Sequence, residues 1–196
     1  MAFERFPIRQ LFEDPANVLD RRSWPATLPA VAHLLDHGLD LSPATVFVGE
    51  NGSGKSTLVE AIALSYGLSP EGGSTGAQHT TRSTESELAN HLQLVRNAGT
   101  TRRGYFLRAE TMHGLFTYLE LNPRAPQHEQ DLTFHQMSHG ESFLELVMDR
   151  FRGRGLWLQI LEVGSWGIRP KPWDELDLVA NWQAFLSSPQ RYLKHL

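Results

Sequence analysis

The fold is decided by the stretch Gly49-Glu50-Asn51-Gly52-Ser53-Gly54-Lys55-Ser56-Thr57, which fits the pattern G-x-x-x-x-G-K-[ST] without a mismatch. Before it, residues 44–48 form the apolar, β-branched run Ala-Thr-Val-Phe-Val, which is typical of a buried parallel strand. After it, residues 57–64 carry apolar side chains at helical spacing. A strand, a glycine-rich turn and a helix in this order predict a phosphate-binding loop. The alternative, an ordinary Gly/Ser-rich turn, explains neither Lys55 nor the flanking pattern.

Each position of the loop requires the residue type that it carries. Glycines at 49, 52 and 54 permit backbone conformations that a Cβ forbids, so the N–H groups from Asn51 to Ser56 can surround a β-phosphate. The helix that follows directs its positive dipole end at the same anion. Lys55 is predicted to bridge the β- and γ-phosphates, Ser56 to bind Mg²⁺, and Thr57 to reach the α-phosphate. The predicted ligand is a nucleoside triphosphate with Mg²⁺, bound by Gly49, Asn51, Gly52, Ser53, Gly54, Lys55, Ser56 and Thr57.

Length and composition limit the classes of protein that the chain can belong to. Its 196 residues are enough for one domain with a sizeable core. The formal net charge of −4 gives no global positive field that would attract nucleic acid. The absence of cysteine excludes a disulfide framework, a thiolate metal site and cysteine catalysis. No apolar run has membrane length and the N-terminus is charged from the start, so we expect a soluble, cytoplasmic protein without a membrane partner.

Further strands and helices are predicted on both sides of the loop. Residues 6–12 are expected to form an edge strand, and residues 25–38 a helix that ends at Gly38. The other predicted elements are a surface loop at 69–84, a helix at 85–96, a strand at 104–110, helices at 111–121 and 143–151, and a strand that starts at 155.

Two groups of polar residues in these elements are open to more than one interpretation. His33 and His37 are four residues apart and could bind a metal, but no third ligand is near in sequence, so we interpret them as solvated. Four arginines form the one local concentration of positive charge, and we interpret them as a solvated strand end rather than as a contact with a phosphate or polyanion. They are Arg96, Arg102, Arg103 and Arg108.

A second motif, Ser138-His139-Gly140-Glu141, precedes an apolar-periodic helix. Ser138 with Glu141 three residues later is a good capping box, which by itself is a purely structural explanation. Together, however, the two motifs resemble the phosphate loop and signature sequence of the ATP-binding cassette class of ATPases. More closely, "VFVGENGSGKSTLVEAIA", "RRGYFLRAE" and "MSHGESFLELVMDRF" look like the bacterial AAA-family small predicted ATPases related to the chromosome-maintenance and recombination branch of that class.

The resemblance covers roughly residues 28–158 and implies an α/β fold, with a mainly parallel sheet flanked by helices. It also implies Mg²⁺-dependent ATP hydrolysis and a homodimer in which two protomers sandwich the nucleotide. Ser138, Gly140 and Glu141 of one protomer would then meet the γ-phosphate that the other protomer binds. Glu110 falls where the class usually has a glutamine that contacts Mg²⁺ or the attacking water.

The sequence departs from this class after residue 158, so we divide one domain of residues 1–196 into a family-like part, 1–158, and a divergent part, 159–196. The class has a strand that ends in Asp-Glu, whereas Gln159, Ile160 and Leu161 stand at the corresponding positions. Glu162 is the nearest carboxylate, and Asp174-Glu175 follows a proline-containing segment that cannot be a buried strand. We further expect the chain to end before the last strand of the class and its switch histidine, for which His195 is no convincing substitute.

Three explanations of this divergence remain open: a frame-altered or truncated product, an insertion with a rebuilt catalytic carboxylate, or a divergent member that binds ATP without turnover. The function therefore has alternatives. The chain could be an ATP-gated switch without catalysis, a DNA-associated ATPase, or a small-molecule kinase or GTPase with the same loop. A GTPase would need Asn-Lys-x-Asp to read guanine, and the sequence contains no Asn-Lys pair.

Overall fold

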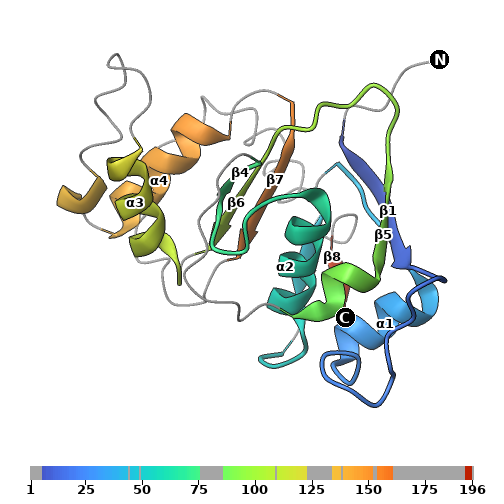
Figure 1. Cartoon of the computed structure of the whole chain (residues 1–196). Helices are drawn as coiled ribbons and strands as arrows, with labels where there is room; N and C mark the ends of the chain where they lie inside the picture. Colours follow the sequence, from blue (N-terminus) through green and yellow to red (C-terminus); the bar gives the residue numbers. More distant parts are fainter. Residues whose placement is uncertain are drawn as a thin grey trace.

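The computed structural model describes a mixed α/β architecture in which small sheets alternate with helices (Figure 1). The described residues are 6–43, 45–48, 50–75, 86–108, 110–122, 134–137, 139–151, 154–160 and 193–195. The first half of the chain contains β1 (Ile8–Glu13), α1 (Pro29–His37), β2 (Leu39–Asp40), β3 (Val46–Val48), α2 (Lys55–Tyr66) and β4 (Gly73–Ser74). The second half contains η1 (Glu87–His91), β5 (Leu92–Arg96), β6 (Gly104–Arg108), α3 (Met112–Leu121), η3 (Phe134–Gln136), α4 (His139–Arg150), β7 (Leu156–Ile160) and β8 (Leu193–His195).

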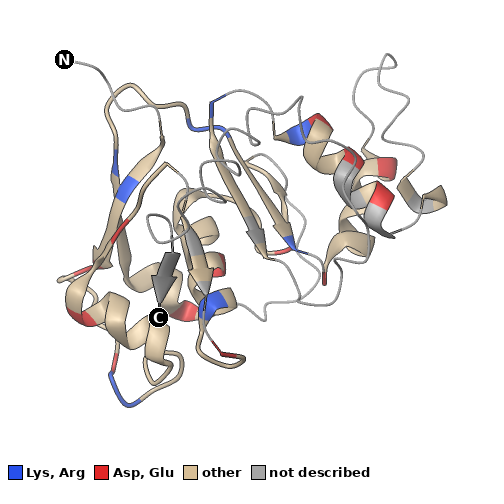
Figure 2. Ribbon diagram, turned by 180° about the vertical axis from the view of Figure 1, so that it is seen from behind, with Lys and Arg blue, Asp and Glu red and all other residues tan. Residues whose placement is uncertain are grey.

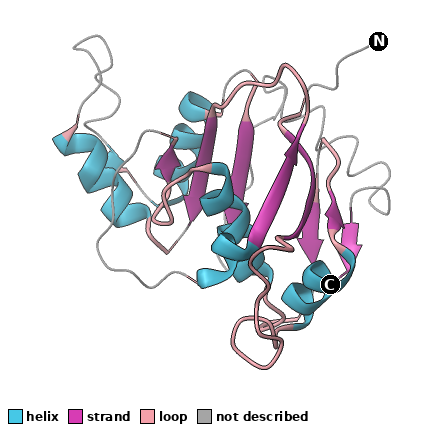
Figure 3. Cartoon of the chain, turned by 45° about the vertical axis from the view of Figure 1, so that its right-hand side comes forward, coloured by secondary structure: helices cyan, strands magenta, loops and turns pink. Residues whose placement is uncertain are grey.

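The described strands pair in three sheets, which occupy the middle of the molecule with helices around them (Figure 3). One sheet has the order β2-β1-β5 and is antiparallel throughout. The others are the parallel pair β3-β8 and the sheet β4-β6-β7, in which β6 and β7 are parallel and β4 is antiparallel. The α/β class is therefore confirmed. Among the described strands, parallel pairing is limited to two pairs, so a mainly parallel sheet stays a prediction.

Two of the predicted helices and strands differ from the structure, and the predicted surface loop at 69–84 contains the short strand β4. Residues 92–96 form strand β5 rather than the second half of a helix, because Leu92 and Leu94 pair with β1 and alternate with the exposed Gln93. Strand β1 is the central strand of its sheet, not an edge strand, because β2 and β5 both pair with it. The other predicted helices and strands agree with the structure to within a few residues, whereas the short elements β2, β4, η3 and β8 were not predicted.

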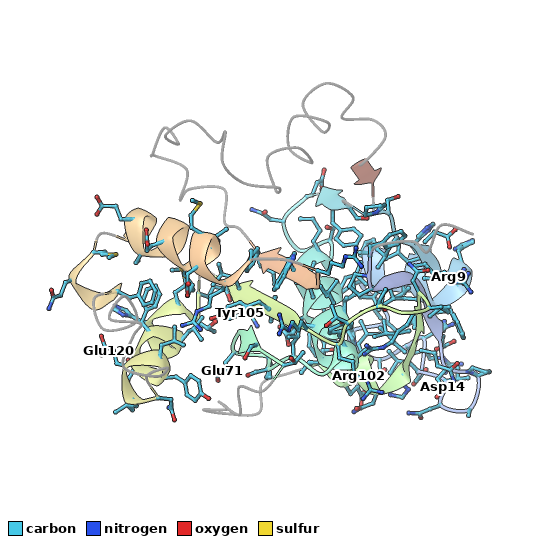
Figure 4. All side chains as sticks on the ribbon, turned by 90° about the horizontal axis from the view of Figure 1, so that it is seen from above. Arg9, Asp14, Glu71, Arg102, Tyr105 and Glu120 are labelled. Atoms are coloured by element: carbon cyan, nitrogen blue, oxygen red, sulfur yellow. The ribbon has the colours of Figure 1, made fainter. Side chains whose placement is uncertain are left out.

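Strand β6 separates two hydrophobic cores. Phe106 belongs to the core that contains α1, α2 and the inner face of β1. Tyr105 and Leu107 point to the opposite face and pack with α3 and α4 (Figure 4). Because both faces of β6 are covered, its residues from 104 to 107 are all buried. The buried middle of β6 fixes the position of its C-terminal end, which carries Arg108.

The C-terminal part of the chain contains the expected strand and one further strand. Strand β7 continues through Gln159 and Ile160 in parallel register with β6, so the strand itself is present although it carries no Asp-Glu. A further strand, β8, runs parallel to β3 with His195 opposite Val48, which corrects the expectation that the chain ends before such a strand. Glu162, Asp174 and Glu175 lie outside the described residues.

No helix in the described part of the chain is both long enough and apolar enough to cross a membrane.

Candidate functional site

The predicted phosphate loop connects β3 to α2, as its sequence requires. Gly49 lies outside the described residues, whereas Gly52 and Gly54 both have positive φ angles, of 83° and 97°. Gly54 is the N-cap of α2, and the Leu58 N–H donates to the Gly54 carbonyl oxygen at 2.9 Å as the first hydrogen bond of the helix. The N–H groups of residues 55–57 therefore precede the helical ladder, at the end where the dipole is positive.

The start of helix α1 contacts the loop, and the sequence did not predict this contact. The Ala30 N–H in the first turn of α1 donates to the Ser53 carbonyl oxygen at 3.0 Å. A Cβ on Gly54 would lie only 3.0 Å from the Cβ of Leu28. The glycine at position 54 is thus required by its φ angle and also by the close approach of the residues that start α1.

Lys55 folds its side chain back over the loop. Its Nζ donates to the Glu50 carbonyl oxygen at 2.6 Å and lies 3.4 Å from the Ser53 Oγ. The Ser53 N–H also donates to the Glu50 carbonyl oxygen, at 3.2 Å, so this oxygen is shared by a turn and an ammonium group. Ser56, the predicted Mg²⁺ ligand, is exposed and directly follows Lys55 at the start of α2. The Lys55 ammonium group and the exposed Ser56 hydroxyl thus both lie where the loop meets the first turn of α2.

A chain of three charged residues links α2 to the C-terminal end of β6. Arg108 donates from Nη1 to the Glu60 Oε2 at 2.6 Å and from Nη2 to the Glu110 Oε2 at 2.8 Å. The side chains of Arg108 and Glu60 are only 18% and 13% exposed, whereas that of Glu110 is 48% exposed. The structure therefore links the predicted site residue Glu110 to the loop's own helix through Arg108. Sequence reasoning had grouped Arg108 with the solvated arginines, and this assignment is wrong.

The loop, α2 and the end of β6 lie within a region of the chain that matches a known protein family. Residues 35–116 match a family model described as an AAA domain. The match includes β3, the phosphate loop, α2, β6 and Glu110, and it spans less than half of the 196 residues. It supports an AAA-type P-loop ATPase family, whose general activity is nucleotide binding and ATP hydrolysis. No curated protein and no solved structure matches the chain.

The second motif lies outside the AAA match, at the start of α4. Ser138 is not among the described residues, so the predicted capping box is not tested. Gly140 and the exposed Glu141 lie in the first turn of α4. Helix α4 ends at Arg150 and β7 begins at Leu156, so the helix returns alongside the sheet and its first turn lies toward the edge where β6 and β7 end (Figure 1). Glu110 follows β6 at this same edge.

The remaining arginines of the predicted cluster lie at the opposite end of β6. Arg96 stacks over the ring of Tyr66, with its Cζ 4.3 Å from the ring centroid. The Tyr66 hydroxyl donates to the Thr101 carbonyl oxygen at 3.0 Å, and burial raises the pKa of this hydroxyl. Arg102 and Arg103 are exposed where β6 begins. The four arginines therefore do not form one cluster.

Metal ligands from the protein are few in the described part of the chain. His33 and His37 are exposed and stack on each other, with ring centroids 4.8 Å apart. The described ranges contain no group of three or more His, Cys, Asp or Glu side chains that could hold a metal ion. Mg²⁺ commonly takes only one or two protein ligands and completes its shell with water and phosphate oxygens. An exposed Ser56 hydroxyl and the half-exposed Glu110 carboxylate are side chains of the kind that such a site would use.

Proposed function

We propose that the chain binds ATP with Mg²⁺ at the loop of residues 49–57 and hydrolyses it to ADP and phosphate. The observation that carries the proposal is the loop itself: two left-handed glycines lead into the N-terminus of α2, with Lys55 at the mouth, within the region that matches an AAA domain. This arrangement places backbone N–H groups, a helix dipole and an ammonium group around one point, as the binding of a triphosphate requires.

Each residue of the loop has a separate task in this proposal. The N–H groups from Asn51 to Ser56 bind the β-phosphate, and Lys55 exchanges the Glu50 carbonyl oxygen for phosphate oxygens, where its charge stabilises the transferring phosphoryl group. The Ser56 hydroxyl holds Mg²⁺, which when bound neutralises charge on the phosphates. Thr57 contacts the α-phosphate. Glu110 orients the attacking water or contacts the hydrated metal from the end of β6.

We further propose that two copies of the chain close on the nucleotide. In this ABC-type arrangement, Ser138, together with Gly140 and Glu141 in the first turn of α4, meets the γ-phosphate that the partner's loop binds. The support is that the first turn of α4 lies toward the edge where β6 ends and Glu110 follows. A helix N-terminus is an anion site, and hydrolysis would remove the charge that holds the two copies together.

A switch that binds ATP without hydrolysis is the alternative, and the sequence of β7 motivates it. The strand ends with Gln159 and Ile160, so it carries neither carboxylate of the Asp-Glu pair that the class uses for Mg²⁺ and for the nucleophilic water. In this case the nucleotide would control dimerisation alone.

The proposal is tested with Lys55→Ala, in assays that measure ATP binding and phosphate release side by side in the presence of Mg²⁺. We expect the variant to lose binding by at least about tenfold, since a charge-assisted contact to phosphate is removed. Arg22→Ala removes an exposed positive charge elsewhere and should bind as the wild type does. Unchanged affinity in Lys55→Ala would contradict the proposed site. Binding without release in the wild type would favour the switch.

A DNA-associated ATPase is a second candidate function, supported by one feature of the surface. Arg102 and Arg103 precede β6 and Arg154 precedes β7, and because Gly104 pairs with Leu156, these arginines start neighbouring strands. All three are exposed, and Figure 2 shows basic residues where these strands begin. Positive side chains grouped in this way can bind the phosphates of a nucleic acid.

A further inference from the structure

We propose that Arg108 is a positioning residue, which through Glu60 holds the Glu110 carboxylate on the Ser56 side of α2, where the metal and the γ-phosphate act. This inference rests on the proposed function and deepens it. It concerns two residues, Arg108 and Glu60, that the phosphate-loop motif does not contain.

The first step is the position of Glu60 on α2. Ser56 and Glu60 are four residues apart in one helix, so their side chains lie on the same face, about 6 Å apart along the axis. Glu60 accepts the Arg108 Nη1 at 2.6 Å, and this brings the end of β6 to the helix face that carries the Ser56 hydroxyl. The contact is nearly buried on both sides and is therefore little weakened by solvent.

The second step is that the two carboxylates bound by Arg108 differ in exposure. The pair with Glu60 lies inside the protein, whereas Glu110 is about half exposed and therefore able to contact a ligand in solvent. A guanidinium group has several donors in a rigid plane, so it can hold two carboxylates at a fixed separation. Lysine has a single ammonium point charge on a flexible stem and cannot reproduce this geometry.

The third step concerns the metal. Residues that orient a metal's ligands without contacting the metal affect its binding almost as strongly as the ligands themselves. Arg108 would orient Glu110 in this way, and Glu110 would contact the metal directly or through a water molecule. The phosphate loop would be unaffected, since its glycines and Lys55 make their contacts without Arg108 among the described residues. The expected consequence is a loss in the Mg²⁺-dependent part of nucleotide binding alone.

The test measures the affinity of the purified chain for a fluorescent ATP analogue, once in EDTA and then across a Mg²⁺ titration. We expect Arg108→Lys to raise the Mg²⁺ concentration for half-maximal binding by about tenfold, and to leave the affinity in EDTA within about twofold of wild type. Glu110→Gln should have the same effect, and the double variant should lose no more than Glu110→Gln alone, because both changes act through one carboxylate. Arg102→Lys, at the far end of β6, is the matched control and should change neither quantity.

The outcomes separate this inference from the function on which it rests. If Lys55→Ala abolishes binding but Arg108→Lys has the same Mg²⁺ titration as Arg102→Lys, the function stands and the positioning role is wrong. Equal losses with and without Mg²⁺ in Arg108→Lys would also overturn it, because they would indicate a structural effect. If Arg108→Lys does not fold, Glu60→Gln replaces it as the test. This variant keeps a hydrogen-bond acceptor for Arg108 but removes the charge of the ion pair, so it should also raise the Mg²⁺ concentration for half-maximal binding. Absence of binding in the wild type and in Lys55→Ala alike would overturn both proposals.

Discussion

At the scale of single residues, Gly54 is subject to two independent constraints. Its φ angle of 97° lies in the region that only glycine adopts readily, and its Cα is so close to Leu28 that a Cβ would be 3.0 Å from that residue's Cβ. Gly67, at the other end of α2, has nearly the same φ angle of 96°, but nothing lies within 4 Å of the Cβ position. The two glycines therefore have the same backbone strain for an L-residue but differ in the space available to a Cβ.

We predict that Gly54→Ala destabilises the protein more than Gly67→Ala does. The left-handed backbone costs an alanine about 1–2 kcal/mol at either position, and the contact with Leu28 adds about 1–2 kcal/mol at position 54 alone. Urea unfolding of both variants measures the difference. The same crowding should push the loop out of shape, so Gly54→Ala should also bind nucleotide more weakly than Gly67→Ala does. Equal losses of stability would show that α1 yields easily and does not support the loop rigidly.

At the scale of elements, Arg21 joins β1 to α1. Its guanidinium makes two contacts with Glu13 at the end of β1, of 2.6 and 2.8 Å, and one with Asp36 in α1, of 3.2 Å. It also donates to the Leu35 carbonyl oxygen at 3.2 Å. The hydrogen bond from Arg21 holds the pKa of the Glu13 carboxyl below its usual value, and Glu13 in turn raises the pKa of Arg21. Because the Ala30 N–H of α1 donates to the loop at Ser53, we expect Arg21 to stabilise the site indirectly.

We predict that Arg21→Ala lowers the free energy of unfolding by about 1 kcal/mol at pH 7, a value reduced for the partial exposure of Arg21. A carboxyl whose pKa is lower in the folded state stabilises that state above the unfolded pKa, of about 4.3, and this contribution is lost as the pH falls through the folded pKa. The difference between the wild type and Arg21→Ala should therefore be full above about pH 5 and shrink in more acidic solution. Unfolding curves at several pH values measure it. The exposed neighbour Arg22, changed to Ala, should show no such dependence, and a constant difference in Arg21→Ala would contradict the prediction.

At the scale of the whole molecule, the sequence predicted what depends on local pattern. The phosphate loop, the helix that ends at Gly38 and the strand of residues 104–108 follow from glycine positions and apolar spacing, which neighbouring residues determine. Strand β5 was missed because its pairing partner, β1, lies about 80 residues earlier and overrides a weak helical preference. The ion pair between Arg108 and Glu60 was missed for the same reason: the residues are 48 positions apart, and only the packing of α2 against β6 brings them together.

Charge is also distributed unevenly over the molecule, and this leads to the last prediction. The net charge of −4 repels a polyanion overall, so under the second candidate function we expect the binding of DNA to depend on the edge where Arg102, Arg103 and Arg154 begin β6 and β7. We expect weak affinity for duplex DNA that falls with salt, with a slope of log affinity against log salt of about −0.9 for each phosphate contacted. The double variant Arg102→Ala/Arg103→Ala should reduce the slope by about 2, whereas Arg22→Ala should leave it unchanged. Fluorescence anisotropy with a labelled duplex, measured across a salt series, gives both slopes. No retention of DNA at low salt, or equal slopes in the two variants, would contradict the second candidate function and leave the basic edge as an ordinary solvated surface.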